Sequence, residues 1–278
     1  KKDLRFRLIM NKNDTLIKTL FVAISLCLVC SIIISLAAVG LRDQQKYLKQ
    51  KDQQSKILSS AGLLTNQKPI EELFLAIEER VVNLDTGKYE ESLDPESFNG
   101  KKFESEDYSR DPLTSIRLRT KVDISSLKRR ENFKKIYIYK EENKIKAIIL
   151  PVRGLGLWGT LYGYLAIEPD LNTIIGLEYF SHKETPGLGA EVDNPRWKSQ
   201  WRGKKIYSSS GEIKIEVLKG LVDAESLEKK HQVDGLSGAT ITSRGVTNML
   251  SFWLGELGYA KFLNNLKIEI KKEETLNV

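Results

Sequence analysis

Cysteine and histidine are scarce in this sequence of 278 residues. It holds two cysteines, Cys27 and Cys30, and two histidines, His182 and His231. Both cysteines lie in an uncharged apolar run, so the rest of the chain has no thiol for a disulfide framework. Two thiolates cannot complete a four-ligand metal or cluster site, and two histidines cannot supply an all-histidine one. We therefore interpret the cysteines as packing residues and expect the water-exposed part to be stabilised by its hydrophobic core.

Basic patches with interleaved aromatic residues are also missing, although the formal net charge is +7. Basic and acidic residues alternate, as in KEENKIKA and SLEKKHQVD, which is typical of a solvated surface. We therefore expect no nucleic-acid partner. Two enzyme motifs are excluded by their spacing: GLGLWG does not match the dinucleotide-binding fingerprint, and DGLSGA does not match the nucleophile elbow G-x-S-x-G.

The longest apolar run is Thr19–Leu41, which contains no charged residue. At about 1.5 Å per residue it reaches roughly 34 Å, which predicts one membrane-spanning helix. A cleaved signal peptide is the alternative, but its apolar part is normally shorter. Basic residues flank the run on both sides and do not determine the orientation. We expect a short inner tail at residues 1–18 and a large outer domain, because long domains translocate largely regardless of charge.

Residues 42–68 are charged and favour a helix, which predicts a membrane-proximal stalk before a domain at residues 69–278. The domain is expected to begin with an amphipathic helix at Pro69, where Leu73, Ile77 and Val81 recur at helical spacing. From about Asp85 to Lys128 the sequence is polar and rich in turn residues, so we expect a long surface excursion there.

Alternating apolar residues predict antiparallel strand pairs from Phe133 onward. The first pair flanks the turn KEEN, the second consists of Leu161–Ile167 and Thr173–Phe180, and the third flanks SSSGE. Asn194 and Pro195 are suited to begin a helix between the later pairs. Because strands and helices do not alternate as they do in parallel sheets, the sequence predicts an α+β domain with a mainly antiparallel sheet flanked by helices.

The stretch DGLSGATITSRGV, Asp234–Val246, places glycines and hydroxyl side chains directly before an apolar helical pattern. Either Thr242 or Ser243 is expected to cap this helix. The free amides at a helix entrance favour an anion by about 0.3–1 kcal/mol, whereas the alternative is an ordinary glycine-rich turn. His231 is a candidate general base for Ser237 or Thr240, but we favour a surface histidine.

Four segments together carry a family resemblance. DGLSGAT, Asp234–Thr240, resembles the signature D-x-x-[ST]-G-A-T, at which FMN is attached through its phosphate to the last threonine in the FMN-binding domains of bacterial redox pumps. This segment, extended to DGLSGATITSRGVTNMLSFWLG, and three others resemble the C subunit of the sodium-translocating NADH:quinone oxidoreductase; the others are AAVGLRDQQ, GLGLWGTLYGYLAI and ETPGLGAEVDNPRW. Residues 1–9 precede the usual start of this family, so Met10 is expected to be the initiator.

The resemblance implies a covalent phosphoester between Thr240 and FMN. Its recognition motif includes Asp234, Ser237, Gly238 and Ala239. The resemblance also implies that residues of two glycine-rich loops lie against the flavin, namely Trp158, Gly159, Glu184, Thr185, Gly187 and Leu188. A threonine hydroxyl is a poor nucleophile at neutral pH, and the sequence shows no machinery to activate it. A separate flavin transferase that acts on FAD is therefore implied as a partner.

The resemblance implies an electron carrier within a membrane-bound NADH:ubiquinone reductase, with no substrate chemistry of its own. FMN is expected to relay single electrons between redox centres of neighbouring subunits, coupled to Na+ export. The implied location is the inner membrane, with a single pass and a periplasmic C-terminal domain. Two alternatives stay open: the G subunit of an Rnf-type ferredoxin:NAD oxidoreductase, and a non-redox, membrane-anchored module for phosphate-ligand binding or assembly.

Overall fold

The computed structural model describes residues 16–93, 109 and 111–276, and divides the chain into two compact units that meet between Gln50 and Lys51. The predicted tail at residues 1–18 lies outside the described part except for its last three residues, which belong to the first helix. Most of the predicted excursion from Asp85 to Lys128 is described, but residues 94–108 and 110 lie outside it.

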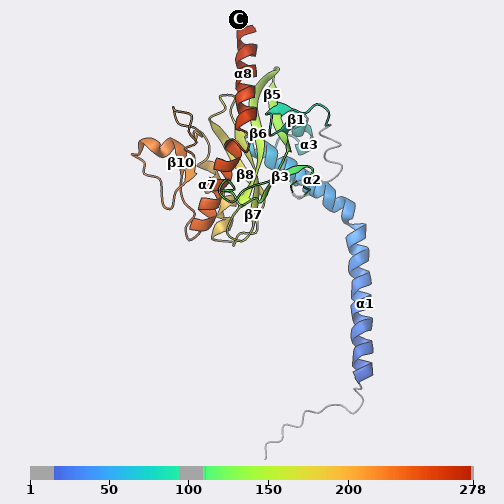
Figure 1. Ribbon diagram of the computed structural model, residues 1–278. Coiled ribbons are helices and arrows are strands. Elements are labelled where there is room, and N and C mark those ends of the chain that lie inside the picture. Colours follow the sequence, from blue (N-terminus) through green and yellow to red (C-terminus); the bar gives the residue numbers. More distant parts are fainter. Residues whose placement is uncertain (1–15, 94–108, 110, 277–278) are drawn as a thin grey trace, which may run out of the picture. The chain divides into compact units, whose positions relative to one another are not determined.

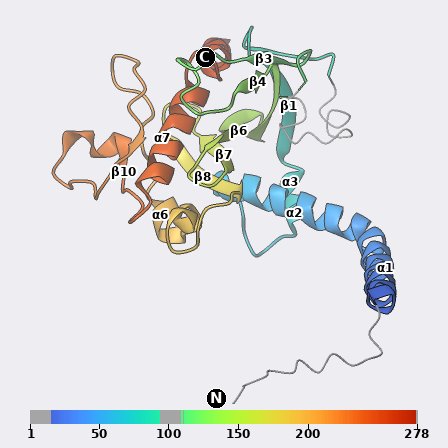
Figure 2. The ribbon, with the colours of Figure 1, turned by 60° about the horizontal axis from the view of Figure 1, so that its bottom comes forward.

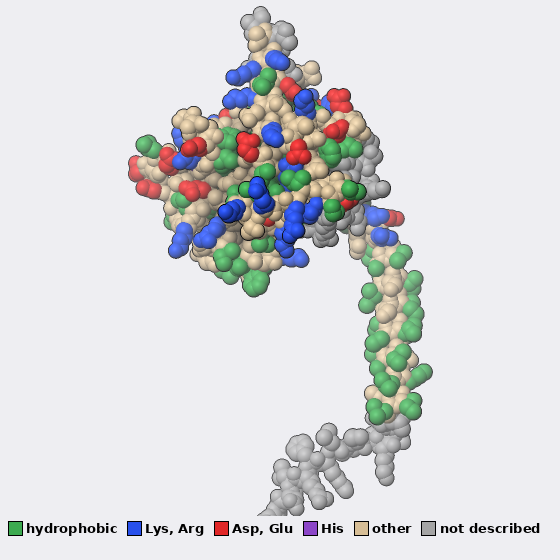
Figure 3. Space-filling view, in the orientation of Figure 1, with side chains coloured by type: hydrophobic (Ala, Val, Ile, Leu, Met, Phe, Trp, Pro, Cys, Tyr) green, Lys and Arg blue, Asp and Glu red, His purple; other side chains and the backbone are tan. Residues whose placement is uncertain are grey.

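Helix α1, Leu16–Gly40, is drawn in Figure 1. It carries no charged residue after Lys18 and has no buried residue. Its most apolar window has a mean hydropathy of 2.8 and it rises roughly 37 Å, which is long and apolar enough to cross a membrane. Figure 3 shows hydrophobic side chains from one end of α1 to the other. Cys27 and Cys30 are exposed on this helix. Because water cannot favourably solvate such a surface, α1 needs lipid or protein around it.

A six-stranded antiparallel sheet forms the centre of the second unit, in the order β2-β1-β5-β6-β7-β8 (Figure 1). The strands are β1 (Ile77–Asn83), β2 (Lys88–Tyr89), β5 (Phe133–Glu141), β6 (Lys144–Leu155), β7 (Thr160–Ile167) and β8 (Ile174–Ser181). The first two predicted strand pairs and the α+β class are confirmed. Glu142 and Asn143 join β5 to β6 with φ values of 49° and 63°, as a tight hairpin requires.

The segment after Pro69 differs from the prediction of one amphipathic helix. Helix α3 covers only Ile70–Phe74, and the chain then enters β1, which pairs with β5 over its whole length. A spacing of four residues places Ile77 and Val81 on one side of a helix and equally on one side of a strand. The tertiary contact with β5 selected the strand, which suits the β-branched Val81 and Val82.

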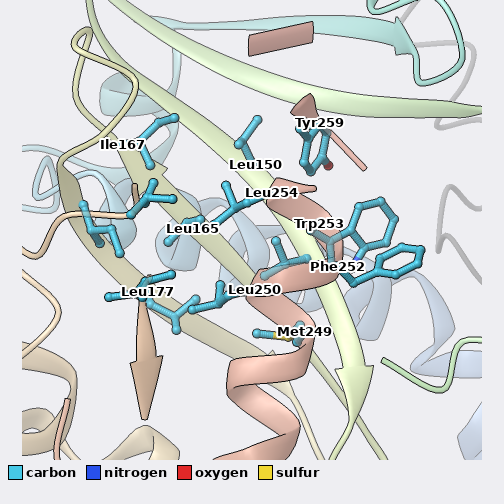
Figure 4. Packing of buried hydrophobic residues seen from close by; sticks show 14 of the residues in the cluster. Leu150, Leu165, Ile167, Leu177, Met249, Leu250, Phe252, Trp253, Leu254 and Tyr259 are labelled. Carbon is cyan, nitrogen blue, oxygen red and sulfur yellow. The ribbon is translucent and has the colours of Figure 1, made fainter. Parts of the chain in front are cut away.

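The two faces of the sheet carry separate hydrophobic cores, because successive side chains of a strand point to opposite faces. Helices α7 (Thr240–Leu254) and α8 (Ala260–Leu276) contribute to the larger core. Figure 4 shows Met249, Leu250 and Leu254 of α7 directed toward β-strand side chains such as Leu150 and Leu165.

The other face is covered by the end of α2 (Arg42–Ser60; Figure 2). Ile57 and Leu58 of α2 are buried there. The stalk segment, which is poor in apolar residues, thus still contributes core residues. Buried Glu178 on β8 joins the end of α2 to the sheet, because it accepts a hydrogen bond from Ser59 Oγ at 3.0 Å. It also accepts one from Lys198 Nζ at 2.7 Å.

Short elements complete the domain. The predicted third strand pair is reduced to one antiparallel bridge, Tyr207 to Ile213, and the residues after it pair in parallel with a later strand. The predicted start of a helix at Asn194 is confirmed, because Asn194 Oδ1 accepts the Arg196 amide at 2.9 Å. The short elements are β3 (Ser115–Arg117), β4 (Arg129–Glu131), η1 (Gly189–Asp193), α6 (Pro195–Ser199), β9 (Glu216–Val217), η2 (Leu227–His231) and β10 (Gln232–Val233).

Gly176 on β8 permits the close approach of α2. A Cβ atom at Gly176 would lie 2.6 Å from the carbonyl oxygen of Ser60. We expect Gly176→Ala to lower the free energy of unfolding by about 1–3 kcal/mol, because backbone must move to admit the methyl group. Urea unfolding of the full chain in detergent, followed by tryptophan fluorescence, measures the loss. Gly220→Ala, where the added Cβ meets open space, is the matched control. Equal effects of the two substitutions would contradict the prediction.

A buried ion cluster lies beneath α7. Glu131 is completely enclosed; one of its oxygens pairs with Lys134 Nζ, and the other accepts a hydrogen bond from Arg153 Nη2 at 2.7 Å. The Lys134 ammonium lies 4.3 Å from the ring centroid of Trp253. Burial alone raises the pKa of Glu131, but the charges of Arg153 and Lys134 outweigh it and lower the pKa from 4.5 to about 2.

Acid is therefore expected to destabilise this domain through Glu131. Because the pKa of Glu131 is lower in the folded than in the unfolded chain, its ionised form stabilises the fold above pH 4.5. This contribution is lost as the pH falls toward 2, which lowers the free energy of unfolding by about 3 kcal/mol. Urea midpoints measured across this window test the prediction. The Glu131→Gln chain, which lacks the titrating group, should show a shallower acid dependence. The prediction fails if both chains lose the same stability between pH 4.5 and pH 2.

Candidate flavin site at the start of α7

The loop between β10 and α7 is held in place by hydrogen bonds between side chains and the backbone. Asp234 Oδ1 accepts the Val222 amide at 2.7 Å, and the Asp234 carbonyl accepts Trp197 Nε1–H at 2.8 Å. Gly238 turns the chain with φ of 70°, a conformation that favours glycine. The loop thus reaches the helix entrance with a fixed direction.

Helix α7 begins at Thr240, with Ala239 as its N-cap and no side-chain cap. The prediction that Thr242 or Ser243 caps the helix is therefore wrong. The reason is that both hydroxyls have other partners: Ser243 Oγ accepts the Leu236 amide at 3.0 Å, and Thr242 Oγ1 donates to Glu184 Oε2 at 2.5 Å. Both side chains are buried inside the first helical turn.

The four hydroxyl side chains of the loop and first turn thus have different environments. Thr242 and Ser243 are enclosed and hydrogen-bonded, whereas Ser237 is exposed and Thr240 is half-buried. Among the described residues, Thr240 Oγ1 has no hydrogen-bond partner. The amides of residues 240–242 likewise have no acceptor in the described part of the chain, because the first helical bond runs from the Ser243 amide to the Ala239 carbonyl. A phosphate group on Thr240 would therefore meet free amides and the positive end of the helix dipole.

Glu184 connects this helix entrance to the glycine-rich loop between β6 and β7. Its Oε1 accepts the amides of Leu157 and Trp158, at 3.0 Å and 2.9 Å. Its Oε2 accepts a hydrogen bond from the hydroxyl of Thr242. Glu184 as a whole is only 5% exposed. The structure thereby brings Trp158, Glu184 and the start of α7 into one contact network.

Apolar side chains are exposed around this network. Trp158 is 66% exposed, Leu188 is 44% exposed and Ile241 is 55% exposed. A Cβ atom at Gly238 would lie 2.9 Å from Leu188 Cδ2, so Leu188 directly adjoins the loop before Thr240. Exposed apolar surface beside an anion site suits a ligand that has both a flat ring and a phosphate group, as FMN does.

Three further predicted site residues lie in the loops that carry Trp158 and Leu188. Thr185 accepts the amides of Leu188 and Ala190 through its carbonyl, at 3.1 Å each, and thereby closes the turn. Gly187 lies in that turn with φ of 76°, and Gly159 directly precedes β7. Thr185 and Gly187 are exposed, whereas Gly159 is half-buried.

Two features of the site were not predicted from the sequence. Thr242 acts as a donor to Glu184, and Gly189 borders the same carboxylate, where a Cβ atom would overlap Glu184 Oε2. The glycines of ETPGLG indicated that other groups approach the backbone closely there, but the sequence did not show which groups these are. The interpretation of His231 as a surface histidine is wrong, because it is 3% exposed and its Nδ1 lies 2.7 Å from the Lys205 carbonyl.

Comparison with known proteins identifies the domain that contains this loop and helix. The family model of the FMN-binding domain matches residues 156–255. The C subunit of the Na(+)-translocating NADH-quinone reductase of Pseudomonas aeruginosa is 43% identical over 93% of this chain and 98% of its own length. The C subunit of the Neisseria meningitidis reductase is 41% identical over 91% and 95%.

Solved structures show the same fold. The crystal structure of Shewanella oneidensis NqrC superposes with a TM-score of 0.71 at 33% identity and covers 79% of this chain and 99% of that one. The C subunit from Parabacteroides distasonis gives a TM-score of 0.59 at 30% identity, with coverages of 80% and 96%. On this sequence identity, coverage and shared fold, the chain belongs to the NqrC family, the FMN-carrying C subunits of the Na(+)-translocating NADH-quinone reductase, an oxidoreductase complex.

Proposed function

We propose that FMN is bound covalently to this chain through a phosphoester on Thr240 Oγ1. The observation that carries the proposal is the difference between the hydroxyls at the helix entrance: Thr242 and Ser243 are enclosed and hydrogen-bonded, whereas Thr240 is half-buried without a partner in the described part of the chain. The free amides of the first helical turn stabilise the phosphate charge. Ser237, Gly238, Ala239 and Asp234 shape the loop that presents Thr240.

The attachment requires a separate flavin transferase, because no residue of the site activates the hydroxyl. No carboxylate or imidazole among the described residues hydrogen-bonds to Thr240, and His231 is buried against the Lys205 carbonyl. With FAD as the donor, the bond from phosphorus to Thr240 Oγ1 forms and the pyrophosphate bond of FAD breaks. AMP leaves, and the hydroxyl proton passes to a base of the transferase.

The exposed surface beside Thr240 is proposed to hold the flavin ring. Trp158 and Leu188 supply apolar area, and Gly187, where an added Cβ atom would meet nothing within 4 Å, leaves room for the ring to approach the backbone. Gly159 and Thr185 are proposed to border the ring. Glu184 lies behind this surface with its oxygens turned inward. The site thus offers a flat, open position from which FMN exchanges electrons at its exposed edge.

In the complex, the chain is proposed to relay single electrons from NADH toward ubiquinone, between redox centres of neighbouring subunits and coupled to Na+ export. Helix α1 anchors it in the inner membrane by a single pass, with the flavin domain in the periplasm. The domain folds around its own core and presents the site openly, as a carrier that meets other subunits requires. The relatives favour this assignment over the G subunit of an Rnf-type complex or a non-redox module.

In-gel fluorescence tests the covalent bond. The full chain, expressed with a flavin transferase, should show flavin fluorescence on a denaturing gel, and the chain expressed without the transferase should not. Mass analysis of the tryptic peptide His231–Arg244 should show the mass of one FMN phosphoryl adduct. A dark band from the chain expressed with an active transferase would overturn the proposal.

A further inference from the structure

We infer that Glu184 is a positioning residue, which sets the start of α7 against the Leu157–Trp158 backbone and thereby determines where the flavin lies. The inference deepens the proposed function and rests on it for the flavin, but the hydrogen bonds themselves do not depend on the cofactor. Glu184 belongs to a loop that precedes η1, and its contacts join residues that are 26 to 58 positions away in the chain.

The carboxylate of Glu184 is enclosed by the backbone of two glycines in addition to its hydrogen-bond donors. A Cβ atom at Gly156 would lie 2.6 Å from its Oε1, and one at Gly189 would overlap its Oε2. The three donors are two backbone amides and one hydroxyl, so both oxygens act only as acceptors, which suits an ionised carboxylate. Burial of such a group is costly unless hydrogen bonds replace its hydration, and these three bonds do so.

The backbone of Glu184 is fixed as well. Its amide donates to His182 Nδ1 at 3.2 Å, and the other ring nitrogen, Nε2, lies 2.9 Å from Asp193 Oδ2. This chain of contacts connects η1, through Glu184, to the first turn of α7. Thr242 is two residues from Thr240, so a shift of Thr242 moves the attachment point.

This arrangement excludes a direct role of Glu184 toward the phosphate. Both of its oxygens are used, its exposed fraction is 5%, and an anion would repel the phosphate group. Its effect on the flavin therefore passes through two other groups: the Trp158 backbone, which carries the exposed ring, and the Thr242 hydroxyl, which holds the helix. Loss of the Glu184 carboxylate removes the hydrogen bonds of both groups.

The first arm of the test uses the full chain without flavin, in detergent, labelled with 5-fluorotryptophan. Fluorine NMR gives separate signals for the tryptophans, and Trp158→Phe assigns the signal of Trp158. Glu184→Ala is expected to shift and broaden this signal, because two amide contacts are lost. Glu184→Gln is expected to preserve it, because the amide oxygen accepts the same two amides and the NH2 group donates to Thr242.

The second arm measures the rate of covalent flavin attachment by a flavin transferase. Glu184→Ala should slow attachment about tenfold or more, because displacement of a reacting group by about 1 Å has effects of this size. Glu184→Gln should restore most of the rate. Glu178→Ala is the matched control: it removes another buried carboxylate, which holds α2 and α6, and should lower stability without altering the Trp158 signal or the attachment rate.

The outcomes separate the inference from the proposed function. If wild-type chain takes up no flavin, the proposed function fails, and the fluorine arm still decides the role of Glu184. The inference is overturned if Glu184→Ala leaves the Trp158 signal unchanged. It is equally overturned if Glu184→Gln behaves like Glu184→Ala, or if Glu178→Ala produces the same two changes as Glu184→Ala.

Discussion

Thr240→Ala is expected to abolish covalent flavin on this chain while leaving the fold intact. The hydroxyl of Thr240 has no hydrogen-bond partner among the described residues, so its removal breaks no contact of the domain. Alanine is also a favourable residue in a helix, which keeps the cost in stability below about 0.5 kcal/mol. Flavin fluorescence on a denaturing gel should disappear, and the urea unfolding midpoint should stay close to that of wild type.

Two further substitutions locate the attachment. Ser237→Ala should retain the flavin, although Ser237 is the other exposed hydroxyl of the loop. Thr240→Ser should retain some attachment, because serine offers the same nucleophilic oxygen at the same position. Persistence of the adduct in Thr240→Ala, together with its loss in Ser237→Ala at unchanged stability, would assign the bond to Ser237 instead.

Glu131→Ala is expected to destabilise the domain by about 3–5 kcal/mol, which is the usual cost of removing one partner from a buried ion pair. The substitution leaves the charges of Lys134 and Arg153 enclosed in the core. Burial already lowers the pKa of Lys134 to about 8 although Glu131 opposes the shift, so without Glu131 the ammonium is expected to lose its proton more readily. Urea unfolding of the full chain in detergent at pH 7 measures the loss.

The double substitution Glu131→Ala with Lys134→Met is the matched control. It removes both partners of one pair, and the methionine thioether can pack on the ring of Trp253, where the ammonium lies now. Arg153 keeps its hydrogen bond to the Arg129 carbonyl at 3.1 Å. The double variant should therefore be more stable than Glu131→Ala alone. A loss below about 1 kcal/mol in Glu131→Ala would show that the cluster is hydrated, contrary to the burial described above.

Much of the fold was predictable, because it depends on local patterns. The apolar run at Thr19–Leu41 predicted α1 within three residues at its start. Alternation predicted the β5–β6 and β7–β8 pairs, and the capping residue Asn194 predicted α6. The same holds for the helix that ends before Gly255. In each case neighbouring residues in sequence carry the signal, and tertiary contacts agree with it.

The sequence by itself determined that the chain has a membrane-length helix, an antiparallel sheet and a motif with several hydroxyls before a helix. Tertiary structure alone decided which state Ile77–Asn83 adopts and which hydroxyls of the motif are engaged in hydrogen bonds. Paired residues of β1 and β5 lie 50 or more positions apart, and Glu184 lies 58 residues from Thr242, so no local spacing records these contacts. Because the contact with Glu184 engages Thr242, and Ser243 bonds to the Leu236 amide, Thr240 is the hydroxyl of the first helical turn that has no partner in the described part of the chain, and we propose the flavin bond there.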